Sequence, residues 1–194
     1  LPAQTLTFSI TGGADAAKFA INATTGIVTF VTSPDFEAPT DAGANNVYDL
    51  QVTASDGALS VAQSIAVTVT AVNDNTPVIT SAATANFAEN ATGTVIDVNA
   101  TDADLPAQTL TFSITGGADA AKFAINASTG IVTFISSPNF EAPTDAGADN
   151  VYNLTVTASD GTTSNEAAAS VRIKALLFTD TTLRDAHQSL LATR

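Results

Sequence analysis

Short runs in which apolar and polar residues alternate recur along most of the chain. Leu6, Phe8 and Ile10 alternate with Thr and Ser, and residues 48–54 and 65–69 show the same period of two. Such alternation predicts half-buried β-strands, because successive side chains of a strand point to opposite faces of its sheet. Gly, Pro, Asn or Asp separates the runs, and no segment has the period and length of a long helix. The pattern therefore predicts an all-β fold.

Residues 14–30 show the local detail of this pattern. Ala14–Lys18 predicts a short helical turn, and strands at 19–22 and 27–30 are predicted to form a hairpin in which Gly26 can adopt a positive φ. Residues 78–175 predict about seven strands, the number typical of an antiparallel Greek-key β-sandwich of the immunoglobulin type. Tyr48 and Tyr152 start late strands, as tyrosine-corner residues do, and are assigned a structural role.

The chain also contains a long internal repeat. Leu1–Gly57 returns as Leu105–Gly161, and the two copies differ at seven of 57 positions. A period of 104 residues fits an array of whole domains better than the units of a solenoid. We expect one β-sandwich at 1–77 with a linker at 72–77, a second at 78–175, and an unrelated tail at 176–194. Because residues 78–104 have no counterpart before Leu1, the first β-sandwich is expected to lack its opening strands.

Composition narrows the possible chemistry. Six Lys and Arg stand against 19 Asp and Glu, a net charge of −13 that argues against nucleic acid or an anionic membrane surface as a partner. The absence of Cys excludes disulfides and cysteine-ligated zinc, and the single histidine, His187, argues against a multi-histidine metal site. No apolar run approaches the roughly 20 residues of a membrane span, so no membrane insertion is expected. A chain that opens on Leu1-Pro2 is expected to be a fragment, which leaves export open.

The acidic residues gather in short clusters beside turns. These are Asp35 with Glu37, Asn73-Asp74-Asn75 before Thr76-Pro77, Asp102 with Asp104, and Asp160 after Ala158-Ser159. In an extended chain, residues i and i+2 point to the same side, so each spaced pair would present two carboxylates together. Calcium takes six to eight oxygen ligands from carboxylates, amides and carbonyls. The set favours calcium, whereas each residue taken alone is better explained as a turn former.

In this combination, residues 1–175 resemble tandem cadherin-like repeats of bacterial surface proteins. In that family an N-D-N-x-P linker, an upstream D-x-E, a downstream D-x-D and a later A-x-D converge on the junction between two domains and hold calcium. The resemblance therefore implies a calcium site composed of Asp35, Glu37, Asn73, Asp74, Asn75, Asp102, Asp104 and Asp160.

Some positions depart from the family pattern. Ala71 stands where the family usually has an acid two residues before N-D-N. The resemblance implies that Glu89, Asn139 and Glu141 serve a junction beyond the second repeat, where the amide of Asn139 predicts a weaker site. Asp56 is the counterpart of Asp160 in the first repeat, so the resemblance implies that it serves a junction before Leu1.

The tail LLFTDTTLRDAHQSLLATR is similar to a different family, the biotin-dependent carboxyltransferase domain of pyruvate carboxylase and oxaloacetate decarboxylase. In that family the Asp of R-D-A-H-Q binds the catalytic metal and the Arg and Gln contact the keto acid, which would be Asp185, Arg184 and Gln188 here. Its TIM barrel cannot close from one strand. No enzymatic activity is therefore expected, and a fusion scar or chimeric gene model explains the tail better.

The favoured hypothesis is a non-enzymatic, extracellular or cell-surface repeat of an adhesin, stalk or filament, stiffened at its interdomain junction by calcium. Its expected partners are calcium and neighbouring repeats or chains, through homophilic or filament contacts. The alternative is a carbohydrate-binding module of a secreted protein that binds polysaccharide, disfavoured because the chain has no Trp and two Tyr. A carboxyltransferase fragment ranks lower. An incomplete first β-sandwich also permits a strand from another chain to cover its open edge.

Overall fold

The structure is a computed structural model and describes residues 4–175. The described chain divides into two compact units, which we call unit 1 (residues 4–75 and 103–108) and unit 2 (residues 76–102 and 109–175). Both consist of β-strands, and the helical elements among residues 4–175 are two three-residue 3-10 turns. No helix in this part of the chain has the length and apolar character needed to cross a membrane.

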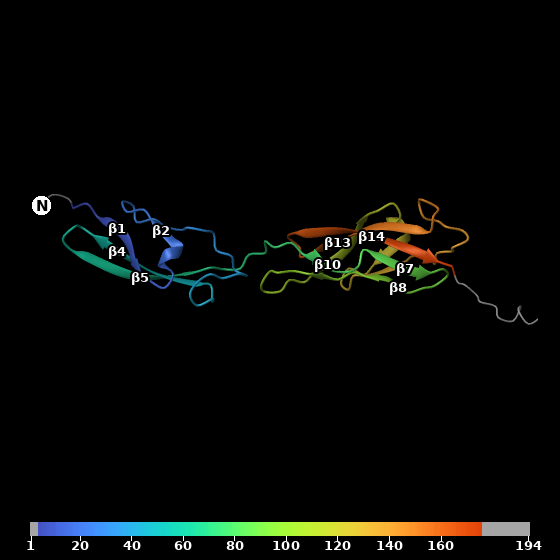
Figure 1. The fold of residues 1–194 in the computed structure, drawn as a ribbon, viewed down its shortest axis with the longest axis horizontal. Coiled ribbons are helices and arrows are strands. Elements are labelled where there is room, and N and C mark those ends of the chain that lie inside the picture. Colours follow the sequence, from blue (N-terminus) through green and yellow to red (C-terminus); the bar gives the residue numbers. More distant parts are fainter. Residues whose placement is uncertain (1–3, 176–194) are drawn as a thin grey trace, which may run out of the picture. The chain divides into compact units, whose positions relative to one another are not determined.

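Unit 1 contains two small antiparallel sheets (Figure 1). Three strands form one sheet in the order β1 (Thr7–Gly12), β4 (Val47–Ser55) and β5 (Ser60–Thr68), and β2 (Phe19–Ile21) pairs with β3 (Val28–Phe30). The 3-10 turn η1 (Ala16–Lys18) precedes β2, and Gly26 has a φ of 70° in the hairpin loop. The predicted helical turn and hairpin are therefore confirmed.

Unit 2 repeats this arrangement and adds strands from residues 78–101. One sheet has the order β10 (Thr111–Gly116), β13 (Val151–Ser159), β14 (Ser164–Lys174) and β7 (Thr84–Ala88), and a second has the order β11 (Phe123–Ile125), β12 (Ile131–Phe134) and β8 (Thr94–Asp97). Two short strands, β6 (Val78–Ile79) and β9 (Ala100–Thr101), form a third ladder, and η2 (Ala120–Lys122) matches η1. Unit 2 thus has nine strands instead of the approximately seven that the sequence predicted.

One cause of this difference is that residues 94–101 form two short strands instead of one. β8 pairs with β12, and β9 pairs with β6 instead. Between them the N–H of Val98 donates to the carbonyl of Gly130 at 3.1 Å, while Val98 itself is buried. The chain therefore passes from one partner strand to another at Val98, a change that alternation along the sequence does not reveal.

The two units differ sharply in how much of the core is buried. The buried cluster of unit 2 contains fourteen hydrophobic residues, whereas that of unit 1 contains three: Phe19, Tyr48 and Leu50. In unit 2 the added strands contribute Phe87, Val95, Ile96 and Val98 to the cluster. Among the described residues of unit 1, no strand takes the place of β7 or β8.

Each unit has a tyrosine corner, which confirms the structural role expected of both tyrosines. The buried Tyr48 hydroxyl accepts from the N–H of Thr40 at 3.3 Å, and Tyr152 accepts from that of Thr144 at 3.2 Å. Each ring also packs edge-on against the phenylalanine of the neighbouring hairpin, Phe30 or Phe134, with centroids 5.2 and 5.1 Å apart. These contacts fix the loop that leads into β4 or β13.

The loop before each tyrosine is organised by a buried aspartate. In unit 1, Asp41 accepts hydrogen bonds from the N–H groups of Gly43, Asn45 and Asn46 at 2.9–3.1 Å. The N–H of Asn45 is the largest influence on the pKa of Asp41, which lies below its usual value. In unit 2, burial raises the pKa of Asp145, but the N–H groups of Asp149 and Asn150 outweigh it and leave that pKa lowered too.

Acid is therefore expected to destabilise both loops. A lowered pKa in the folded state means that the stabilisation is complete above the unfolded pKa of about 3.9 and is lost as pH falls through the lower, folded value. The free energy of unfolding, measured in urea between neutral pH and about pH 3, should fall less steeply in an Asp41→Asn, Asp145→Asn double variant than in the wild type. Identical slopes would show that these carboxylates contribute nothing to the acid response.

Candidate metal centre

Three acidic side chains of unit 1 converge from distant parts of the chain. Glu37, Asp74 and Asp104 each place a carboxylate oxygen within 4.8 Å of the other two. Glu37 lies in the loop between β3 and β4, Asp74 follows β5, and Asp104 belongs to the short segment 103–108. Asp104 follows Glu37 by 67 positions in the sequence, so the tertiary fold brings together carboxylates that repel one another when no cation lies between them.

Hydrogen bonds hold these carboxylates in place. Asp104 is 1% exposed, and its Oδ1 accepts from the side-chain amide of Asn75 at 2.8 Å and from the backbone N–H of Asn75 at 3.1 Å. A longer bond of 3.4 Å comes from the N–H of Asp74. Glu37 accepts from the N–H of Leu105 at 3.1 Å through Oε1. The N–H groups of Asp74 and Asn75 and the side-chain amide of Asn75 thus bind the Asp104 carboxylate from the N–D–N linker.

A cavity of about 280 Å³ opens beside this cluster within unit 1. Its lining includes Asp35, Glu37, Asp74 and Asn75 together with Val69, Thr70 and Val72. Carboxylate and amide oxygens are the donors that calcium prefers, and backbone carbonyls commonly complete its shell. The donor set of this cavity therefore fits calcium. That Val69, Thr70 and Val72 line this cavity had no signal in the sequence, because their side chains carry no typical calcium ligand.

Asp35 lines the same cavity, and its carboxylate binds the backbone of the residues that follow it. Asp35 Oδ1 accepts from the N–H groups of Glu37 at 2.9 Å and Ala38 at 3.1 Å. The local chain is therefore a turn closed by these bonds, instead of the extended segment expected from the sequence. Asn73, the other predicted ligand of unit 1, is half-buried next to Asp74. The metal roles of Asp35 and Asn73 remain predictions.

In unit 2 the remaining two predicted ligands approach each other. Asp102 and Asp160 offer carboxylate oxygens within 4.8 Å of one another. Asp160 Oδ1 accepts from the N–H groups of Thr162 and Thr163 at 2.7 and 2.6 Å. Burial raises the pKa of Asp160, but these donors outweigh it and leave the pKa below its usual value. The ionised carboxylate is the state in which aspartate binds a metal.

The residues assigned to outer junctions are also placed by the structure. Glu89 of unit 2 is buried, and its Oε2 accepts from the N–H of Phe140 at 3.3 Å, between Asn139 and Glu141. Asp56 of unit 1 accepts from the N–H groups of Leu59 and Ala58, which lower its pKa. Their metal roles remain predictions.

Not all acidic residues of this chain, whose net charge is −13, are candidate metal ligands. Asp15 is 4% exposed and binds two backbone N–H groups, those of Ala42 at 2.7 Å and Asp49 at 2.8 Å. Asp119 does the same in unit 2, with Ala146 and Asn153. These aspartates and the loop residues Asp41 and Asp145 have a structural role that sequence reasoning missed, although their place beside Gly-Gly or Ala-Gly could have suggested turn binding.

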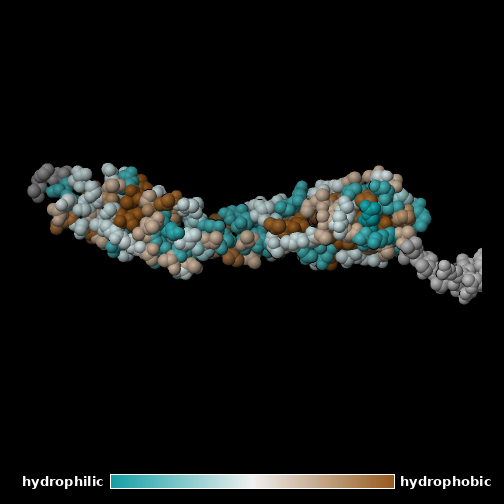
Figure 2. All heavy atoms as spheres, viewed as in Figure 1, coloured by the Kyte–Doolittle hydropathy of each residue, from teal (hydrophilic) through white to brown (hydrophobic). Residues whose placement is uncertain are grey.

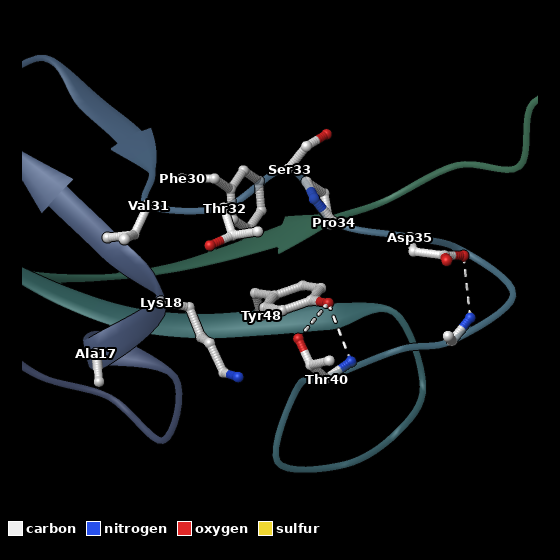
Figure 3. Close-up of a pocket in the computed structure, with 11 residues that line it drawn as sticks. Ala17, Lys18, Phe30, Val31, Thr32, Ser33, Pro34, Asp35, Thr40 and Tyr48 are labelled. Atoms are coloured by element: carbon white, nitrogen blue, oxygen red, sulfur yellow. Dashed lines mark hydrogen bonds between the residues drawn. The ribbon is translucent and has the colours of Figure 1, made fainter.

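Each unit also has a cavity beside its buried tyrosine. In unit 1 it measures about 330 Å³ and lies between Phe30, Lys18, Tyr48 and Thr40 (Figure 3). Asp35 stands at one end, and a dashed line in Figure 3 marks the bond that it accepts from Ala38. The copy in unit 2 measures about 380 Å³ and has Asn139 in place of Asp35. Only one carboxylate lines the unit 1 cavity and none lines the other, so neither has a donor set for calcium.

Comparisons with known proteins agree with this architecture. The Cadherin domain family model matches residues 83–176. Halomucin of Haloquadratum walsbyi is 42% identical over 77 residues, which are 39% of this chain and 1% of that protein. Human Protocadherin Fat 1 is 35% identical over 162 residues, which are 80% of this chain and 3% of the relative. The chain thus spans 1–3% of the length of these two curated relatives.

Solved structures show the same fold. The human Protocadherin-24 EC1-2 structure superposes with a TM-score of 0.69 at 21% identity, covering 90% of this chain and 83% of that one. Drosophila N-cadherin EC1-4 gives a TM-score of 0.61 at 26% identity, covering 89% and 41%. The carboxyltransferase resemblance falls on residues 176–194, outside the described residues, and the comparisons give it no support. Residues 83–176 therefore match the cadherin domain, in a chain whose fold is the β-sandwich fold of cadherin ectodomains.

Proposed function

We propose that this chain is a calcium-binding, extracellular cadherin-like repeat segment of a surface adhesin, stalk or filament. The observation that carries the proposal is the convergence of Glu37, Asp74 and Asp104 within 4.8 Å beside a cavity lined by further oxygen donors. The match to the cadherin domain and to cadherin ectodomain structures supports the extracellular, non-enzymatic role.

Calcium would act here by joining segments that are far apart in the sequence. In unit 1 a cation held by Glu37, Asp74 and Asp104 would connect the β3–β4 loop, the end of β5 and the segment 103–108. In the proposed site Asp102 and Asp160 of unit 2 complete the ligand set, because Asp102 lies only two residues from Asp104. Calcium would thereby fix the chain segments that connect one repeat to the next.

Asp74→Asn is expected to weaken calcium binding at least about tenfold in titration calorimetry, because ligand charge sets the affinity of calcium sites. Asp74 is exposed, so the substitution should leave the fold unchanged. Asp49→Asn is the matched control, since it removes the same charge from unit 1 and reproduces the asparagine of the other repeat at position 153. Extracellular calcium modules bind with a Kd of roughly 10⁻⁴ to 10⁻³ M. Absence of binding by the wild type in that range would refute the proposal, as would equal affinity of the two variants.

A further inference from the structure

The two repeats differ in charge on the outer face of one sheet. Three positions change in the same direction over 104 residues: Asp49 becomes Asn153, Thr68 becomes Arg172, and Thr70 becomes Lys174. The register of β4 with β5 equals that of β13 with β14, so Thr68 and Arg172 are structurally equivalent. Each change removes an acid or adds a base, in a chain whose net charge is −13.

Arg172 stands among polar side chains on this outer face. β7 pairs in parallel with β14, which places Asn86 opposite Arg172 and Thr84 opposite Ser170. Val171 is buried, so its neighbours on β14 point away from the core, because successive side chains of a strand face opposite ways. Figure 2 shows hydrophilic residues over the part of unit 2 where β7 and β14 lie.

A cavity of about 250 Å³ opens between these side chains. It is lined by Arg172, Asn86, Thr84, Ser170, Ala85 and Val151, none of which is acidic. The guanidinium, the side-chain amide of Asn86 and the hydroxyl of Thr84 can all donate hydrogen bonds. The hydroxyl of Ser170 instead donates to Asn153 Oδ1 at 2.6 Å. The cavity thus combines several donors with one fixed positive charge.

We propose that this cavity of unit 2 binds an oxyanion, the carboxylate or phosphate group of a small molecule, with Arg172 as its main contact. The guanidinium fork matches two oxygens of either group at once, and hydrogen bonds to charged groups are about twice as strong as neutral ones. Unit 1 has Thr68 and Asp49 at the equivalent positions and should not bind the anion. Two nearly identical repeats would therefore differ in ligand.

One acid lies where it opposes anion binding. Asp149 shares with Arg172 and Lys174 the lining of a neighbouring cavity of about 440 Å³. Asp149 Oδ1 accepts from the N–H of Val151 at 3.0 Å, and Asn45 makes the equivalent bond in unit 1 at the same distance. Asp149→Asn therefore removes the charge and keeps the bond. This substitution should tighten anion binding severalfold, because it removes a repulsion.

An NMR titration of the isotope-labelled whole chain, with inorganic phosphate in one arm and acetate in the other, tests the proposal. At constant ionic strength, saturable shifts of the β7 and β14 amides are expected, and the tighter anion identifies the preferred group. Arg172→Thr reproduces the residue of unit 1 and should weaken binding at least about tenfold. Lys174→Thr, the matched control, removes the same charge outside this cavity and should weaken binding much less.

Three results would overturn the proposal. The first is the absence of saturable shifts with both anions. The second is equal weakening by Arg172→Thr and Lys174→Thr, which would indicate a general effect of charge. The third is a response of the same size in β4 and β5, because unit 1 lacks the arginine. No calcium is added in these titrations, so their outcome is independent of the proposed metal centre.

Discussion

Removal of calcium is expected to lower the thermal unfolding midpoint of unit 1 by on the order of 10 °C. Without a cation, each pair of carboxylates about 4 Å apart costs about 1–4 kcal/mol, depending on the effective dielectric constant. A ligand present at about a hundred times its Kd stabilises the folded state by about 2.7 kcal/mol. Each kcal/mol shifts the midpoint of a domain of this size by about 4–8 °C.

Tyrosine fluorescence can follow unit 1 alone. The chain has no Trp and two Tyr, one in each unit, so Tyr152→Phe leaves Tyr48 as the reporter of unit 1. Melting curves of this variant should move to lower temperature on addition of EDTA and return with calcium. Magnesium should restore less, because it demands stricter octahedral geometry. An additional Asp74→Asn substitution should remove most of the shift, and a midpoint indifferent to EDTA in the parent variant would contradict a calcium role.

Truncation of one core valine is expected to have very different effects in the two copies. Val132→Ala should lower the free energy of unfolding of unit 2 by about 2–3 kcal/mol, because it removes two buried methyl groups and leaves a cavity. Val28→Ala, the same change at the same place in the repeat, should cost unit 1 about 1 kcal/mol or less. The reason is exposure: Val132 is 0% exposed, whereas Val28 is half-buried.

The paired design is its own control, because the residues around both sites are nearly identical in sequence. Urea unfolding followed by circular dichroism, with Tyr48 or Tyr152 retained as the single tyrosine, gives the two free energies separately. Equal losses would mean that the face of unit 1 is covered in solution.

Much of the local structure could be predicted from the sequence because it rests on short-range rules. Alternation in residues 6–10 and 48–54 identified β1 and β4, and the Gly26 turn identified the β2–β3 hairpin. The division of the strand at Val98 escaped prediction, because the change of partner from β12 to β6 depends on residues remote in sequence. The extended geometry expected for Asp35 and Glu37 was wrong for a local reason, because Asp35 accepts from the N–H groups two and three residues ahead and closes a turn.

For the candidate site, the sequence by itself determined which oxygen donors are available: carboxylates in spaced pairs, an N–D–N linker, and neither Cys nor a histidine within residues 1–175. Only the tertiary structure decided which of them meet. It brought Glu37, Asp74 and Asp104 together, and it directed Asp15, Asp41, Asp119 and Asp145 to backbone N–H groups instead. It also decided that identical valines are buried in unit 2 and half-exposed in unit 1. The meeting of the carboxylates and the burial of the valines have the same physical reason. Residue type fixes what a side chain can bind, but the neighbours of that side chain depend on long-range strand pairing.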